Sequence, residues 1–159
     1  MTLLEKEPVK RVIKLLNDFD PTLSVIILDN SARTAIEAAS SLGCDVGAIV
    51  KSLLFRIENS FLLCLVSGDK KTSLNKIKKI LNIKDVSMAS ADDVKDVTGY
   101  SIGGVSPIGH LKEVKIFIDN SLERFDELFA AAGHPNCVFK INFVNLQKIT
   151  KGIIKEITE

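Results

Sequence analysis

The stretch KSLLFRIENSFLLCLVSG, residues 51–68, decides the fold class. Two apolar runs, 51–57 and 61–68, flank the short polar segment ENS, and this pattern predicts two strands joined by a tight turn. Strands joined so closely are antiparallel, whereas parallel neighbours need a long crossover. The sheet of this protein is therefore expected to be mixed rather than purely parallel.

The rest of the chain alternates irregularly between strand and helix patterns. Further strands are expected at 24–28, 85–89, 114–119, 136–142 and 153–157. Helices are expected at 8–19, 31–43, 70–79, 90–99, 121–133 and 144–152, with a short helical stretch before residue 51. We therefore predict an α/β (α+β) fold: a single domain over residues 1–159, with a mixed sheet of six to eight strands, or a partial barrel, flanked by helices.

Capping residues set the expected helix ends. Pro8 suits a first turn, and the helix it opens carries an apolar stripe made by Val9, Val12, Ile13, Leu16 and Phe19. The other starts have the N-cap candidates Ser31, Thr34 and Ser90. Three helices are expected to end at Gly43, Gly99 and Gly133.

The composition is that of an ordinary globular protein, with 46% hydrophobic and 26% charged residues and a net charge of +1. The longest apolar runs are too short to span a bilayer, and the first residues lack the apolar segment of a signal peptide. We expect a cytoplasmic protein. Its three cysteines stand far apart and predict neither a disulfide framework nor a zinc site; Cys64 is expected to pack as a small hydrophobe.

A local basic run departs from the neutral balance: residues 70–79 hold five lysines in ten positions. Leu74, Ile77 and Ile80 are at helical spacing and should face inward, leaving Lys76, Lys78 and Lys79 outside. A solvated helix face is the ordinary explanation. A contact surface for phosphates is the functional one.

Common catalytic and cofactor motifs are missing. SGDKKTS at 67–73 lacks the spacing of a phosphate-binding P-loop, GYSIGG is not GxGxxG, and neither GxSxG nor HExxH occurs. An enzyme of this sequence is expected to use no metal, nucleotide cofactor or serine triad. Backbone groups, a lysine or the substrate itself would then carry catalysis.

Three features stand out, and each has an ordinary explanation when taken alone. Lys51 begins an apolar strand, where a solvated lysine is common. The loop VTGYSIGGVSPIGH, residues 97–110, holds four glycines and can be a long turn. AGHPN, residues 132–136, can simply end a helix at Gly133 and lead into an extended segment at His134-Pro135.

Taken together, in order and spacing, these features resemble the YbaK / prolyl-tRNA synthetase-associated domain family. The likeness is carried by VKSLLF, LVSGDKK, TGYSIGGVSPIGH and LFAAAGHPNCVFKI, and it covers most of the chain. Members are aminoacyl-tRNA deacylases, which hydrolyse the ester between a wrong amino acid and the tRNA 3′ end. The resemblance implies a mixed sheet flanked by helices.

The resemblance also implies site residues. It assigns catalysis to Lys51, Gly103, Gly104 and His134. It assigns substrate binding to Ser52, Val105, Ser106 and Pro107. Weak tRNA phosphate contacts would come from Lys70, Lys71 and Lys76. Mischarged tRNA is the implied partner, prolyl-tRNA synthetase is a further one, and no membrane is involved.

An aminoacyl ester is already reactive, so the site need only hold it, place a water and stabilise the oxyanion. Glycine lacks a Cβ and lets backbone groups approach closely. Size exclusion by Ile102, Val105 or Ile108 would admit alanine or cysteine and refuse proline, because attraction alone discriminates a methylene weakly.

Two other classes of function stay open at this stage. One is a module that binds the tRNA 3′ end or a nucleotide without catalysis. The other is a protein-interaction domain. Lys51 together with GGVSP favours the deacylase, because a module without catalysis would not need both.

Overall fold

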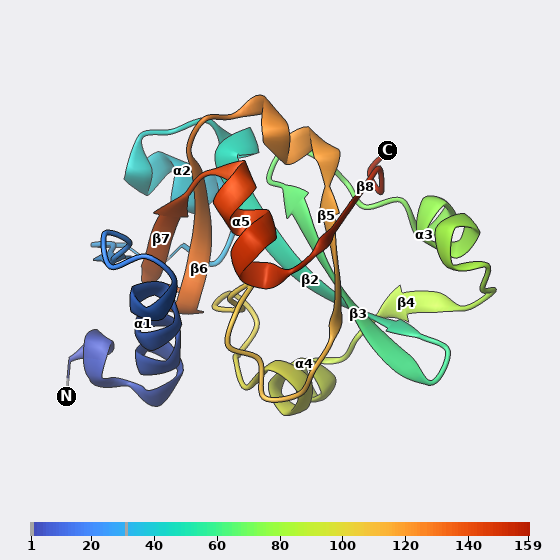
Figure 1. Ribbon diagram of the computed structural model, residues 1–159, viewed down its shortest axis with the longest axis horizontal. Helices are drawn as coiled ribbons and strands as arrows, with labels where there is room; N and C mark the ends of the chain where they lie inside the picture. The colour runs from blue at the N-terminus through green and yellow to red at the C-terminus, as the bar shows by residue number, and fades with distance from the viewer. Residues whose placement is uncertain (1, 31) are drawn as a thin grey trace.

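The computed structural model describes residues 2–30 and 32–159 (Figure 1). Five α-helices form where periodicity and caps predicted them, except that no helix covers residues 121–133. They are α1 (Glu7–Phe19), α2 (Ala35–Leu42), α3 (Leu74–Leu81), α4 (Ala91–Thr98) and α5 (Phe143–Thr150). Three short 3₁₀ turns accompany them: η1 (Leu3–Glu5), η2 (Val46–Ala48) and η3 (Asn120–Arg124).

The predicted caps are largely confirmed. Pro8 lies in the first turn of α1. The side chains of Thr34 and Ser90 accept hydrogen bonds from backbone amides in the first turns of α2 and α4, whereas the candidate Ser31 lies outside the described residues. Gly43 and Gly99 take left-handed conformations that end these two helices.

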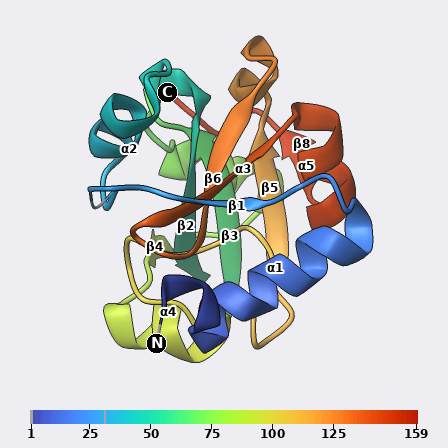
Figure 2. The ribbon, with the colours of Figure 1, turned by 90° about the vertical axis from the view of Figure 1, so that its left-hand side faces the viewer.

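Eight strands form one mixed sheet, as expected. They are β1 (Val25–Ile27), β2 (Ile49–Ile57), β3 (Ser60–Ser67), β4 (Val86–Met88), β5 (Lys115–Asp119), β6 (Leu128–His134), β7 (Cys137–Ile141) and β8 (Ile153–Lys155). The order is β1-β7-β6-β2-β3-β5-β8, with β4 paired to β2. Strands β2 and β3 form the predicted antiparallel hairpin, and β2–β6, β3–β5 and β5–β8 are parallel. The sheet is strongly twisted and curls toward a half-barrel, as Figures 1 and 2 show from two directions.

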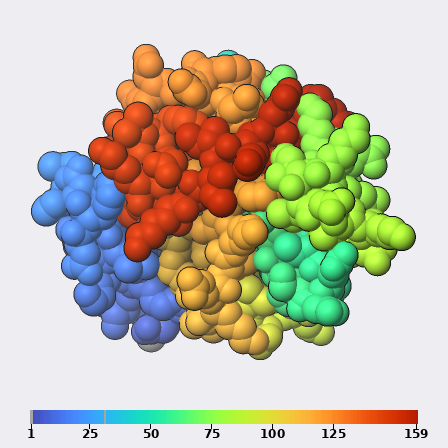
Figure 3. All heavy atoms as spheres, turned by 45° about the vertical axis from the view of Figure 1, so that its right-hand side comes forward, coloured from blue at the N-terminus to red at the C-terminus, as the bar shows by residue number. Residues whose placement is uncertain are grey.

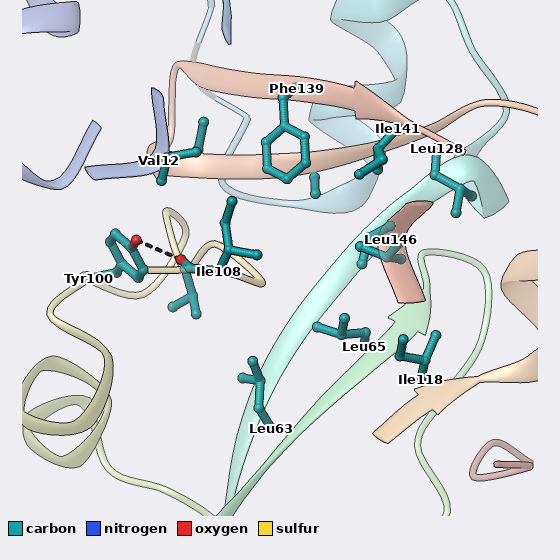
Figure 4. Close-up of a cluster of buried hydrophobic side chains, with 14 of the residues drawn as sticks. Val12, Leu63, Leu65, Tyr100, Ile108, Ile118, Leu128, Phe139, Ile141 and Leu146 are labelled. Atoms are coloured by element: carbon teal, nitrogen blue, oxygen red, sulfur yellow. Dashed lines mark hydrogen bonds between the residues drawn. The ribbon is translucent and has the colours of Figure 1, made fainter. Parts of the chain in front are cut away.

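Alternate residues of β2 feed different cores on the two faces of the sheet. Val50 and Leu54 join the main core, which also takes Val9, Val12 and Leu16 from α1 and Leu146 from α5 (Figure 4). Phe55 joins a second core under α3, together with Cys64, which is fully buried as predicted. Ile49 joins a third, smaller core under α2. Phe19 lies at the edge of the α1 stripe and remains 37% exposed.

The helix predicted for residues 121–133 is wrong. The segment forms η3 and then strand β6, which pairs with β2 on one side and β7 on the other. Its alanines favour a helix locally, but Leu128, Ala130 and Ala132 alternate inward as a strand requires. Gly133 therefore ends no helix. It has φ +92°, and a Cβ there would lie 2.8 Å from the Pro8 carbonyl oxygen, so its size lets the start of α1 pack closely on β6.

The lysine helix differs from the expectation at two positions. Ile77 is fully buried and Leu74 partly so, but Ile80 is 38% exposed because Leu81 takes the inner position. Lys76 does not project freely: its Nζ lies 2.6 Å from the Thr158 carbonyl oxygen. This contact joins α3 to the C-terminal segment, and Figure 3 shows the two side by side. No helix within the described ranges is long and apolar enough to cross a membrane.

Candidate functional site

Strand β2 has a break in its pairing on the side away from β3. Its ladder with β6 ends at Val50↔Ala130, and its ladder with β4 begins only at Phe55↔Met88. Between them, one backbone hydrogen bond to this edge is found in the described residues: the Ala89 amide donates to the Leu54 carbonyl at 3.0 Å. The sheet is thus open beside residues 51–53.

A pocket of about 340 Å³ lies at this break. Its wall is mostly apolar and comes from β2, β4, β6, β7, α2 with the segment before it, α4 and the loop after α4. The lining residues include Arg33, Lys51, Ser52, Met88, Ile102, Gly103, Val105 and Phe129. The volume falls within the range of small-ligand sites.

Lys51 lies on β2 and is one of the residues that line the pocket. Its Nζ donates a hydrogen bond to the Lys70 carbonyl oxygen at 2.6 Å. Desolvation by burial lowers the pKa of Lys51, and the nearby Asp69 carboxylate opposes that shift. The strand therefore places a partly desolvated cation beside a mostly apolar cavity, which Arg33 also lines.

Ser52 presents unpaired polar atoms to the same place. Its buried Oγ has no hydrogen-bond partner in the described residues. The Ile49 carbonyl accepts from Gly68 on the β3 side, so residues 50, 52 and 54 direct their backbone groups to the other edge. The Ser52 amide and carbonyl consequently point into the break, where none of the strands in the described residues pairs with them.

The glycine loop after α4 closes the pocket from the opposite side. Ile102, Gly103 and Val105 line it, and Ile102 is 62% exposed at its mouth. Gly103 has φ +94°, a conformation that favours glycine. The Gly104 amide donates to the Ser101 carbonyl at 3.0 Å, so its hydrogen is already used within the loop.

Gly104 packs against the end of β6. A Cβ there would lie 2.9 Å from the His134 Cα and 3.0 Å from the His134 nitrogen. His134 itself is half-buried outside the pocket wall, and its Nδ1 accepts from the Asn136 amide at 3.0 Å. Burial, followed by the charges of Lys6 and Arg33, lowers the pKa of His134 and favours the neutral ring.

Ser106 and Pro107 belong to the same loop but are buried and do not line the pocket. The Ser106 carbonyl lies 2.7 Å from His110 Nε2. Tyr100 donates through its hydroxyl to the Ile108 carbonyl at 2.7 Å, the bond dashed in Figure 4. Ile108 joins the main core and so sets no pocket limit of its own.

Arg11 completes this support from α1. Its Nε donates to the Gly109 carbonyl at 3.2 Å, and its guanidinium lies 4.9 Å from the centre of the Tyr100 ring. Together, Arg11, Tyr100 and His110 brace the glycine loop against the body of the protein. Sequence reasoning missed this brace because Arg11 stands about ninety positions from the loop.

The predicted residues thus divide into two groups. Lys51, Ser52, Gly103 and Val105 meet at one pocket, whereas Gly104, Ser106, Pro107 and His134 support it from behind or beside it. Sequence reasoning also missed Arg33, Met88 and Phe129, which line the wall from other elements. Met88 remains 60% exposed on its short strand, a property that the sequence alone does not show.

The three lysines expected to meet phosphates have different settings. Lys76 bonds to the Thr158 carbonyl and lies 3.4 Å from Glu156. Lys71 lies 3.9 Å from Glu159. Lys70 contributes its backbone carbonyl to Lys51. Of these, Lys76 is thus committed to the fold through its hydrogen bond to Thr158.

Comparisons with known proteins identify the family and the fold of this chain. A family model described as the aminoacyl-tRNA editing domain matches residues 29–149. A crystal structure described as that of a proposed trans-editing enzyme for prolyl tRNA synthetase superposes with a TM-score of 0.90, at 34% identity over 97% of this chain and 98% of that one.

Curated relatives include both short and long proteins. The uncharacterized protein YwhH of Bacillus subtilis is 33% identical over 71% of this chain and 72% of its own length. The proline–tRNA ligase of Caldicellulosiruptor bescii is 30% identical over 85% of this chain. The chain spans only 23% of that ligase, so the similarity concerns one part of a larger enzyme.

Proposed function

The chain belongs to the aminoacyl-tRNA editing domain family, and we propose from this premise that it hydrolyses the ester bond of a mischarged tRNA. The observation that carries the proposal is the convergence of the Lys51 ammonium, the unpaired edge of β2 at Ser52 and the glycine loop on one small apolar pocket. The substrate we propose is proline tRNA charged with a small amino acid, alanine or cysteine.

The pocket suits such an ester. Its apolar wall would take the amino-acid side chain, with Val105 and Phe129 limiting its size. Exclusion by contact discriminates better than attraction, because one methylene contributes only about 1–3 kcal/mol of preference. A larger residue such as proline would be refused.

The residues around the pocket have distinct proposed roles. Water attacks the ester carbonyl carbon, the bond to the ribose oxygen breaks, and that oxygen takes a proton. Lys51 would bind the terminal phosphate or the ester region as a cation, since a lysine near phosphates stays protonated. The Ser52 amide points into the break and is free to donate to the oxyanion that forms.

The other predicted residues would act through the loop. Gly104, Ser106 and Pro107 would fix the position of Gly103 and Val105, and His134 would orient a water or the amino group from the edge of the site. Lys70 and Lys71 would meet the tRNA backbone weakly. A synthetase for proline would be the partner that supplies the mischarged tRNA, which places the protein in the cytoplasm.

The test is a deacylation panel of tRNAs charged with alanine, cysteine, serine or threonine. The wild type should release a small amino acid, and Lys51→Ala should lower the rate about 100-fold or more, the usual effect of removing one charge-stabilising group. Lys148→Ala, an exposed lysine on α5, serves as the matched control.

Two results would contradict the proposal. Hydrolysis by Lys51→Ala at the wild-type rate would remove the role given to that lysine. Salt-sensitive tRNA binding without release of any amino acid would favour the non-catalytic module instead.

A further inference from the structure

The turn after β3 holds the only hydrogen-bond partner of the Lys51 ammonium in the described residues. That partner is the Lys70 carbonyl, and the Lys70 amide in turn donates to the Ser67 carbonyl at 3.0 Å. The direction of the ammonium therefore depends on how firmly this turn is held. The turn belongs to SGDKKTS, the segment that resembles a P-loop but lacks its spacing.

Arg124 of η3 binds this turn through its guanidinium group. Its Nη2 donates to Asp69 Oδ1 at 2.8 Å and its Nη1 contacts Asp69 Oδ2 at 3.2 Å, a two-pronged arrangement. Nη2 also lies 2.9 Å from Ser67 Oγ. The same Ser67 hydroxyl reaches the carbonyl of Gly47, in the turn that leads into β2.

Arg124 is itself held in place on η3. Its Nε donates to the Ser121 carbonyl at 2.7 Å, and its guanidinium lies 4.8 Å from the centre of the Phe125 ring. Phe125 packs directly on Gly47, where a Cβ would meet its ring at 2.5 Å. Through its contacts with Phe125, Ser67 and Asp69, Arg124 thus connects the segment before β2 with the turn after β3. These are the two segments that flank Lys51.

In this cluster, Arg124 stabilises the ionised form of Asp69, and Asp69 in turn stabilises the charged form of Lys51. The hydrogen bond from Arg124 is the largest of the causes that lower the pKa of Asp69 to about 2, so its carboxylate is ionised at any neutral pH. That carboxylate favours the charged form of Lys51. Yet both side chains of the pair are about 40% exposed, and exposed pairs contribute little to stability.

We propose that Arg124 is a positioning residue for the proposed deacylation, and that it acts through Asp69 and the 67–70 turn to aim the Lys51 ammonium at the pocket. Arg124 and Asp69 do not line the pocket, so their contribution is indirect. The inference rests on the proposed function for its kinetic test but not for its spectroscopic one.

The kinetic test uses alanine-charged proline tRNA. Arg124→Gln and Asp69→Asn should each lower kcat about ten- to a hundredfold, as small displacements of a catalytic group do, with KM unchanged. The double variant should be no slower than the slower single variant. Arg124→Lys keeps the positive charge but cannot make the two parallel hydrogen bonds to Asp69, so its kcat should lie between those of the wild type and Arg124→Gln.

Arg56→Gln is the matched control. Arg56 also stacks on a phenylalanine, Phe61, and pairs with an aspartate, Asp93, but it lies away from Lys51. Its kcat should equal that of the wild type. Thermal melting checks that each variant is folded, and Asp69→Asn provides the test if Arg124→Gln is not.

Three results would overturn the proposal. One is a wild-type kcat for folded Arg124→Gln, or an equal loss in Arg56→Gln. Another is a double variant whose fold-loss of kcat equals the product of the losses in Arg124→Gln and Asp69→Asn. The third is a raised KM with a weaker salt dependence and an unchanged kcat, which would make Arg124 a direct tRNA contact.

The spectroscopic test separates this idea from the proposed function. The Lys51 side-chain resonance, assigned by its loss in Lys51→Ala, is titrated with pH by NMR in the free protein. Asp69→Asn should lower the Lys51 pKa, because the ammonium loses a nearby opposite charge. An unchanged Lys51 pKa would overturn the coupling, whether or not the wild type deacylates any tRNA.

Discussion

Lys51 and Ser52 are adjacent in sequence but lie on opposite faces of β2, and both reach the same pocket. Side chains of neighbouring strand residues normally serve different environments. Here the break in the pairing beside residues 51–53 lets the pocket extend past the edge of the strand. The pairing register, rather than either side chain alone, brings the two together.

Gly104 packs against backbone atoms, so a larger residue at this position has no flexible neighbour to displace. Gly104→Ala would place a methyl within 3.0 Å of the His134 backbone, which cannot swing away as a side chain would. We expect a loss of about 1–3 kcal/mol in the free energy of unfolding, the usual cost of overpacking. Urea denaturation measures it, and an unchanged midpoint would show that the loop and β6 can separate.

Gly43→Ala is the informative comparison for this variant. Gly43 has open space around its Cβ position but a φ of +67°. The Gly43→Ala variant should lose about 1–2 kcal/mol in the free energy of unfolding through backbone conformation alone. Its deacylation rate should equal that of the wild type. Gly104→Ala should slow deacylation as well, because the displaced loop lines the pocket.

At the scale of elements, the sequence predicted the β2–β3 hairpin, the glycine loop and the ends of α2 and α4 at Gly43 and Gly99 correctly, whereas the helix end predicted at Gly133 is wrong. Local signals determine these features. Strand β6 was missed because LFAAAGH has the local propensity of a helix, and only its neighbours β2 and β7 and the close approach of α1 at Gly133 make it a strand. Propensity is a weak guide where tertiary contacts decide.

The candidate site divides in the same way. Lys51 and Gly103 were expected from a resemblance that spans contiguous motifs. Arg11, Arg33 and Arg124 were not, because each reaches the site through contacts between distant parts of the chain. No local pattern distinguishes such an arginine from a solvated one.

The glycine loop's brace should make stability depend on pH. Burial lowers the pKa of His110 and the charge of Arg11 adds to this shift, whereas the hydrogen bond with the Ser106 carbonyl opposes it, so the folded state favours the neutral ring more than the unfolded chain does. Below the unfolded pKa of about 6.5 the unfolded chain binds a proton that the folded chain does not. The free energy of unfolding should therefore fall as pH drops from 7 to 5.

His110→Gln is the variant that isolates this effect. It should show a shallower fall in urea denaturation between pH 7 and 5. His134→Gln removes a ring whose pKa is lowered in the same direction at a less buried position, so its change should be smaller. An identical pH dependence in His110→Gln and the wild type would refute the assignment to His110.

At the scale of the whole molecule, the C-terminal segment is fastened at two places. Lys76 binds the Thr158 carbonyl from α3, and the fully buried Asp119 accepts from the Ile157 amide at 2.8 Å and the Thr158 hydroxyl at 3.1 Å. The Asp119 contacts hold this segment at the carboxyl end of the parallel β5–β8 pair, and the Lys76 contact joins it to α3. The final residues thus belong to the body of the fold.

Asp119→Ala tests how much this fastening contributes. The buried Ile157 amide and Thr158 hydroxyl would lose their acceptor, and each unsatisfied group costs about 1–3 kcal/mol. Thermal melting should show a lower Tm, and hydrogen exchange should show faster exchange of the Ile157 amide. Asp126→Ala, at an exposed position, is the control; equal effects in both variants would contradict the role of Asp119.

The break in β2 also bears on how this protein avoids aggregation. Unpaired strand groups attract other chains when they lie on an outer edge. In this sheet the unpaired groups of β2 lie inside, covered by the glycine loop, while β1, β4 and β8 at its margins are three residues each. The hydrogen-bonding capacity that a ligand needs is thereby kept away from the surfaces where a second chain could add a strand.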